Sequence, residues 1–155
     1  MELIESLLEV ARDAGTEILR IRAAGFTVDR KADETPVTVA DRAAETLILA
    51  RLARLAPGIP VIAEESVAAG EQPVAGERFF LVDPLDGTRE FVAGRDEFTV
   101  NIALVERGQP LLGIVLAPAL GRGFAGDVAS GHAFEARRGP DGVERRQPLQ
   151  VRPPG

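Results

Sequence analysis

The chain has 155 residues, a formal net charge of −6 and a sequence pI near 4.9. An acidic chain without an evident basic face argues against binding to nucleic acid polymers or to anionic membranes. It has no cysteine, which excludes disulfides and thiolate zinc sites, and no apolar run approaches the roughly 20 residues of a membrane span. We therefore expect a cytoplasmic protein whose single domain buries roughly 68–70% of its unfolded surface.

The first segment predicts an amphipathic helix. Across residues 2–23, apolar side chains recur at alternating steps of three and four, at Leu3, Leu7, Val10, Ala14, Ile18 and Ile21. Gly25 is expected to end this helix. The charged segment DRKADETPVT (29–38) lacks periodicity and is expected to form an exposed, mobile loop.

A second helix is expected near Thr38, which forms a capping-box pattern with Asp41 three residues later. Apolar residues continue at helical spacing at Leu47, Ile48, Leu52 and Leu55. Pro57 then ends the helix. The run PVIAEE (60–65) predicts a short strand that ends in two acids.

The second half of the chain is rich in predicted strands. FFLVD (79–83) reads as a buried strand, and FTVNIALVE (98–106) alternates apolar and other residues before a turn. LLGIVLAP (111–118) would return as its antiparallel partner. Two shorter strands are expected within 121–129 and 131–138, and the remaining residues are turn-rich and polar. Helices first and strands later predict an α+β fold, with two helices packed on a mostly antiparallel sheet.

The most informative residues are two aspartates at the end of the strand FFLV. Asp83 and Asp86 flank Pro84 and Leu85, and carboxylates beside a buried strand end are costly without a partner. Divalent cations take oxygen ligands. We expect Pro84 to turn the chain, so that both carboxylates and the Leu85 carbonyl converge on metal ions.

The next two residues fit a phosphate group. Gly87 would let the backbone approach an anion closely, and Thr88 would begin a helix whose N–H groups and dipole favour phosphate. Metal ligands followed at once by anion-binding backbone are what an acidic protein needs in order to handle phosphate.

Three further acidic residues at the ends of predicted elements could also belong to a metal site, and each has a simpler interpretation as well. Asp41 could be an acid that favours a helix start, and Glu64 and Glu65 could be solvated loop acids. A D-x-D-G-T phosphatase motif spaces its aspartates by two, whereas the spacing here is three, so a phosphoaspartyl mechanism is disfavoured. The one histidine, His132, is interpreted as structural.

Taken together, the ordered motifs resemble the inositol monophosphatase family of magnesium-dependent, lithium-sensitive phosphatases. The matching segments are PVTVAD (36–41), AEES (63–66), VDPLDGT (82–88) and the predicted strand pair at 98–118. The likeness extends over nearly the whole chain. It implies that the substrate is a small phosphorylated molecule.

Within this family, DGTREF (86–91) and DEFTVNIAL (96–104) are most similar to bacterial 3'(2'),5'-bisphosphate nucleotidases. The implied reaction converts 3'-phosphoadenosine 5'-phosphate to AMP and phosphate. EESVAAGE (64–71) is more similar to the inositol monophosphatases. Hydrolysis of inositol 1-phosphate therefore stays open as an alternative.

The resemblance also implies a set of metal ligands. Glu64, Asp83 and the Leu85 carbonyl would bind one Mg²⁺, and Asp83 and Asp86 would bind a second. Glu65 would not bind the metal itself but would hold these ligands in position. Two ions about 3.5–4 Å apart can clamp the attacking and leaving oxygens of a phosphoryl group and acidify a bound water.

Further roles follow from the same resemblance. Thr88, held by Asp41, would orient the attacking water, so that both act in catalysis together with Glu64. The amides of Gly87 and Thr88 would hold the phosphate. Lys31 and Asp33 match a mobile family loop that closes on the site and could help to hold a third ion.

The sequence also departs from the family. Family members continue for roughly another domain length, and that part carries a metal-ligand aspartate within a Trp-Asp-x-Ala motif. This chain has no tryptophan. We therefore expect residues 1–155 to form an N-terminal metal-binding domain without its C-terminal partner, with an exposed sheet edge or helix face where that partner would pack. A catalytically silent metal- or phosphate-binding fragment is a further alternative, and a homodimer is a further expectation.

Overall fold

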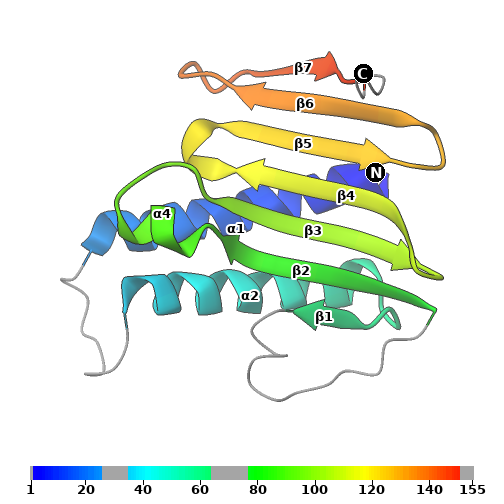
Figure 1. Cartoon of the computed structure of the whole chain (residues 1–155), viewed down its shortest axis with the longest axis horizontal. Helices are drawn as coiled ribbons and strands as arrows, with labels where there is room; N and C mark the ends of the chain where they lie inside the picture. Colours follow the sequence, from blue (N-terminus) through cyan, green and yellow to red (C-terminus); the bar gives the residue numbers. More distant parts are fainter. Residues whose placement is uncertain (1, 26–34, 64–76, 151–155) are drawn as a thin grey trace.

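The computed structural model describes residues 2–25, 35–63 and 77–150. Two long helices, α1 (Leu3–Ala24) and α2 (Pro36–Leu55), lie on one face of a single seven-stranded sheet (Figure 1). A third helix, α4 (Thr88–Val92), is a short turn that follows the second strand. The predicted α+β arrangement is confirmed.

The sheet runs in chain order from β1 to β7. Its strands are β1 (Val61–Ala63), β2 (Arg78–Asp86), β3 (Thr99–Glu106), β4 (Gln109–Ala117), β5 (Arg122–Asp127), β6 (His132–Arg138) and β7 (Glu144–Pro148). The β1–β2 pair is parallel and every later pair is antiparallel. A short 3₁₀ helix, η2 (Pro118–Leu120), joins β4 to β5.

Strand β7 corrects one expectation, because its segment was read as turn-rich and polar without a strand. Its sequence, ERRQP, has no apolar alternation, and most of its residues are exposed. The strand is held by its ladder to β6, in which Ala136 pairs with Arg146 and Arg138 with Glu144. Pairing at the edge of an existing sheet therefore decides its structure, which local sequence does not reveal.

Helix α1 forms as its apolar spacing predicts. Its buried side chains form one stripe against the sheet: Ile4, Leu7, Leu8, Val10, Ala11, Ala14, Ile18 and Ile21. Gly25 ends it with a φ of 61°, a left-handed value that suits glycine. Neither this helix nor any other in the described ranges is long and apolar enough to cross a bilayer.

Helix α2 begins one turn earlier than its sequence pattern indicated. Thr35 is the N-cap, and its side-chain oxygen accepts a hydrogen bond from the Thr38 amide at 3.2 Å. Thr38 therefore lies inside the first turn, and the predicted capping box with Asp41 is wrong. Asp41 lies beyond that turn, so the interpretation of Asp41 as a helix-start acid is also excluded.

The two faces of the sheet differ sharply. Phe80 and Val82 of β2 point to the helices and are fully buried, as are Ile102 of β3 and Ile114 of β4. Leu81, between the first two, points the other way and is 49% exposed. We call the side away from α1 and α2 the open face. The exposed apolar surface is therefore a sheet face, whereas the sequence led us to expect a sheet edge or a helix face.

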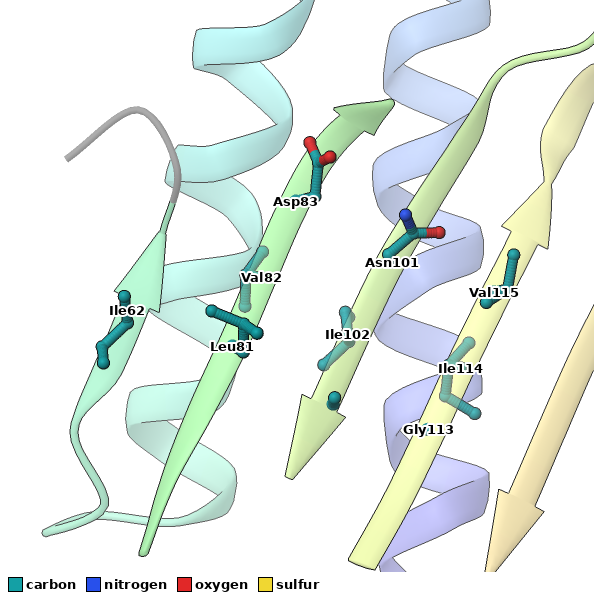
Figure 2. Close-up of a pocket in the computed structure, with 10 residues that line it drawn as sticks. Ile62, Leu81, Val82, Asp83, Asn101, Ile102, Gly113, Ile114 and Val115 are labelled. Carbon is teal, nitrogen blue, oxygen red and sulfur yellow. The ribbon is translucent and has the colours of Figure 1, made fainter. Parts of the chain in front are cut away.

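The open face carries a broad hollow over β1 to β4, with a volume of about 700 Å³. Figure 2 shows Ile62, Leu81 and Val115 along this hollow, with the helices behind the strands. Gly113 leaves open space there, since a Cβ at this position would meet no atom within 4 Å. One end of the hollow is polar, because Asp83 and Asn101 lie there (Figure 2).

Farther along the same face, over β5 and β6, the surface is charged. Glu135 is only 4% exposed and accepts hydrogen bonds from both Arg122 and Arg137. Arg122 also lies over the ring of Phe124, 5.2 Å from its centroid. The hydrogen bonds from Arg137 and Arg122 lower the pKa of Glu135, so this carboxylate stays ionised at neutral pH.

Candidate metal centre

A bulge near the end of β2 places the two aspartates on the same face of the sheet. Asp83 pairs with Asn101 of β3 and Asp86 pairs with Thr99, so three steps along β2 match two steps along β3. In a regular strand, residues three apart point to opposite faces. The extra residue of the bulge changes this, so that Asp86 pairs with Thr99 as Asp83 pairs with Asn101. Cross-strand partners share a face of the sheet, and Thr99 and Asn101 are two apart on β3. Asp83 and Asp86 therefore both belong to the open face.

This geometry corrects the expectation for Pro84. The strand continues through Pro84 to Asp86 and does not turn there. Pro84 and Leu85 are buried, whereas Asp83 is partly accessible and Asp86 is exposed. The two carboxylates thus share a face because of a bulge with two buried residues between them, and their convergence on metal ions stays a prediction. A bulge near a functional site is a common way to re-aim a side chain.

Asn101 connects the two aspartates, although sequence analysis did not single it out. Its amide nitrogen donates to Oδ2 of Asp86 at 3.4 Å, a long hydrogen bond. Its Oδ1 is buried and accepts no hydrogen bond from any residue that the structure describes. The available signal was a polar residue at an alternate position of an otherwise apolar strand, FTVNIALVE. A buried amide oxygen needs a donor or a cation.

Gly87 follows the bulge with a φ of 92°, a left-handed conformation. A Cβ at this position would lie 2.9 Å from the carbonyl oxygen of Glu97 and 3.2 Å from Cα of Phe98. Only glycine fits this approach without displacing backbone. The chain then enters α4 at Thr88, as expected, but this helix has five residues and its dipole is small. Phosphate binding here would depend on the local amides.

Two of the predicted catalytic residues, Asp41 and Thr88, lie on helices. Asp41 projects from α2, which packs against β2 and α4, and Oδ1 of Asp41 is buried. Thr88 is exposed at the start of α4. The arrangement brings the elements that carry Asp41, Asp83 and Thr88 into contact. The hydrogen bond between Asp41 and Thr88 stays a prediction.

Several predicted residues lie outside the described ranges: Lys31, Asp33, Glu64 and Glu65. Strand β1 ends at Ala63, which pairs with Val82 in the neighbouring strand. Glu64 directly follows Ala63 in the sequence, and Ala63 lies beside Val82, the residue before the bulge. Within residues 2–25, 35–63 and 77–150, no three His, Cys, Asp or Glu side chains form a group that could hold a metal ion.

The oxygen atoms near the bulge are nevertheless of the type that binds a hard divalent cation. Asp83 and Asp86 supply carboxylates on one face, the Leu85 carbonyl lies between them in sequence, and Asn101 supplies a buried amide oxygen. All are oxygen donors, the class that Mg²⁺ prefers. The set has two carboxylates, so a third from another segment would complete it.

Comparison with known proteins identifies the family. The sequence profile of the inositol monophosphatase family matches residues 1–154. The chain belongs to this family. Its resemblance to the family in four motifs is thereby confirmed.

Curated relatives are bacterial nucleotidases. The 3'(2'),5'-bisphosphate nucleotidase CysQ of Salmonella typhimurium is 48% identical over 120 residues, which cover 76% of this chain and 49% of that protein. CysQ of Escherichia coli strain K12 is 40% identical over 152 residues, which cover 97% of this chain and 59% of that protein. The chain spans about half the length of the curated relatives that it matches.

Solved structures give the same result for the fold. CysQ from Bacteroides thetaiotaomicron, described as a bacterial member of the inositol monophosphatase family, superimposes with a TM-score of 0.72 at 30% identity, over 97% of this chain and 59% of that one. An inositol monophosphatase of Thermotoga maritima gives a TM-score of 0.70 at 29% identity, over 87% of this chain and 51% of that one. The helices and the sheet thus correspond to about half of a family fold.

Proposed function

We propose that this chain is the metal-binding, N-terminal part of a Mg²⁺-dependent phosphomonoesterase that converts 3'-phosphoadenosine 5'-phosphate and water to AMP and phosphate. The observation that carries the proposal is the bulge of β2, which directs Asp83 and Asp86 to one face beside Asn101. The similarity to CysQ proteins favours the bisphosphate nucleotide as substrate.

In this proposal the residues divide into those that hold the metal ions and those that handle substrate and water. Asp83, Asp86, the Leu85 carbonyl and Glu64 hold the ions, and Glu65 supports them. Bound Mg²⁺ would supply positive charge for the phosphoryl oxygens and lower the pKa of the attacking water.

The remaining tasks concern substrate and water. Asp41 and Thr88 orient the water, and the amides of Gly87 and Thr88 position the phosphate for in-line attack. Lys31 and Asp33 belong to the loop that would close over the site. Asn101 is added here as a residue that orients Asp86, because its side-chain amide donates to that carboxylate.

The test is phosphate release from 3'-phosphoadenosine 5'-phosphate. We expect release to require Mg²⁺, to fall when Li⁺ is added, and to drop at least about 100-fold in Asp83→Asn, because that change removes a ligand of the charged site. Asp96→Asn is the matched control, since Asp96 lies in the exposed loop after α4 and pairs with Arg22 at 3.5 Å. Release that persists in a chelator would refute the proposal.

Inositol 1-phosphate is the substrate of the alternative phosphatase. Both substrates would be compared at equal concentration, with and without Mg²⁺. A higher kcat/KM for the nucleotide supports the proposal, and a higher value for inositol 1-phosphate would replace it with the alternative.

A catalytically silent metal- or phosphate-binding fragment is the second alternative. In that case calorimetry would show Mg²⁺ or Mn²⁺ binding that Asp83→Asn abolishes, with turnover at background. Turnover well above background by the 155-residue chain would exclude it. Two or three ions and a homodimer also stay predictions of the family resemblance, and a cytoplasmic location stays a prediction from the composition.

A further inference from the structure

A second, smaller pocket lies on the helix-covered side of the sheet, opposite the face that carries Asp83. It has a volume of about 180 Å³ and opens between α1, η2 and the strands β4 to β6. Its floor is apolar and includes Leu116, Pro118 and Gly123. The polar side chains at its edge are Arg12, Thr16 and Arg138, and none of the lining residues is acidic.

The two arginines give this pocket a positive edge. The side chain of Arg138 is exposed and forms no hydrogen bond or ion pair with any described residue. Arg12 is more enclosed and contacts Glu144. Burial lowers the pKa of Arg12, and the positive charges of Arg138 and Arg146 lower it further, although Glu5 and Glu9 act in the opposite direction. Arg12 stays charged, and Arg138 adds a second positive charge to this edge.

A backbone hydrogen bond fixes the main chain at Arg138. The Arg138 amide donates to the carbonyl oxygen of Gly121 at 2.9 Å. Gly121 has a φ of 64°, and a Cβ there would lie 2.8 Å from the carbonyl oxygen of Arg138. Gly121 therefore lets the end of β6 come close to the turn after η2, and α1 packs against η2. Arg138 and Arg12 thereby line the same pocket.

We propose that this pocket binds a small organic anion, with a compact apolar body on the floor and a phosphonate, phosphate or carboxylate group between Arg12 and Arg138. Guanidinium groups bind such anions through charge-assisted hydrogen bonds. Drug-sized ligands occupy pockets of roughly 300–1,000 Å³, so about 180 Å³ limits the body to a single small ring or short chain. The site is separate from the metal centre because the two open on opposite faces of the sheet.

Phenylphosphonate is the probe, because it joins one ring to a dianion and has no ester bond to hydrolyse. Binding would be followed by amide and arginine Nε–H chemical shifts of the labelled 155-residue chain in EDTA. We expect shifts at Thr16, Gly121, Gly123 and Arg138, with a dissociation constant on the order of 1 mM or tighter. Methylphosphonate, which lacks the ring, and benzyl alcohol, which lacks the charge, should each bind at least about tenfold more weakly.

Arg138→Gln should weaken phenylphosphonate about tenfold, with thermal unfolding unchanged because this side chain has no partner among the described residues. Arg54→Gln, an exposed arginine of α2, is the matched control and should bind as the unmodified chain does. Asp83→Asn should also bind normally, whatever it does to phosphatase activity. Absent shifts, shifts confined to Gly87 and Thr88, equal affinity in Arg138→Gln, or loss of binding in Asp83→Asn would each overturn the proposal.

Discussion

The covered and open faces of the sheet are made by alternate residues of the same strands, but the two faces have different roles. On β2, Phe80 and Val82 are buried under the helices, while Leu81 is 49% exposed on the other side. The covered face carries the hydrophobic stabilisation that folds the chain. The open face instead carries an apolar hollow, the two aspartates of the bulge and the Arg122–Glu135–Arg137 cluster. The two aspartates of the candidate metal centre therefore lie where packing makes the fewest demands.

Two adjacent residues of β2, Phe80 and Leu81, should differ most in their contribution to stability. Phe80→Ala removes a fully buried ring and should lower the free energy of unfolding by about 3–5 kcal/mol. Leu81→Ala, its neighbour on the open face, should lower it by about 1 kcal/mol or less. Urea unfolding followed by circular dichroism measures both. Equal losses would mean that the open face is covered in solution, for example by a second copy of the chain.

A smaller effect is expected where the chain leaves β2. Gly87→Ala should lower the free energy of unfolding by about 2–4 kcal/mol, because a Cβ would meet the Glu97 carbonyl oxygen and the left-handed φ disfavours alanine. Gly94→Ala is the matched control, with a φ of 78° and open space around the added Cβ. It should cost about 1 kcal/mol. The same unfolding experiment compares them, and equal costs would remove the steric argument for Gly87.

The smallest effect concerns the contact between the sheet edge and α1. Arg146 of β7 donates to Glu5 at 2.7 Å, and this hydrogen bond lowers the pKa of Glu5. Because the folded pKa lies below the unfolded one, the pair stabilises the fold above the unfolded pKa near 4.5 and loses this contribution as pH falls through the folded pKa.

Glu5→Gln should therefore lower the free energy of unfolding at pH 7 by up to about 1 kcal/mol, and the difference from the unmodified chain should shrink as the pH falls from about 5 to 3. Glu9→Gln, on the same helix, is the control and should show a smaller difference. Unfolding curves at several pH values measure this. A difference that does not depend on pH would show that packing, and not the ion pair, is responsible.

The sequence predicted most of the covered face because apolar periodicity encodes it. The three-four spacing from Leu3 to Ile21 predicted α1, and the alternation in 98–106 predicted β3. Strand β7 could not be predicted, since its pairing with β6 and not its composition makes it a strand. The cap of α2 was misplaced because threonine is a common N-cap residue at either position, and the hydrogen bond from the Thr38 amide to the Thr35 side chain decides between them.

For the candidate site, the sequence identified Asp83 and Asp86 but not the reason that they share a face. Proline suggested a turn, whereas the strand accommodates it through a bulge, a feature set by pairing with β3. Asn101 was missed because its significance depends on that register. Likewise, Arg12 and Arg138 are 126 positions apart in sequence and meet at one pocket edge, which no local pattern could indicate.

We infer that the β2 bulge gathers oxygen ligands for a divalent cation. Paramagnetic broadening of backbone amides by substoichiometric Mn²⁺ would locate this cation, with Asp83→Asn and the control Asp96→Asn measured alongside. We expect broadening centred on Asp83 to Thr88 and on Asn101, retained in Asp96→Asn and lost in Asp83→Asn. Broadening spread over unrelated exposed acids, or unchanged in Asp83→Asn, would contradict it.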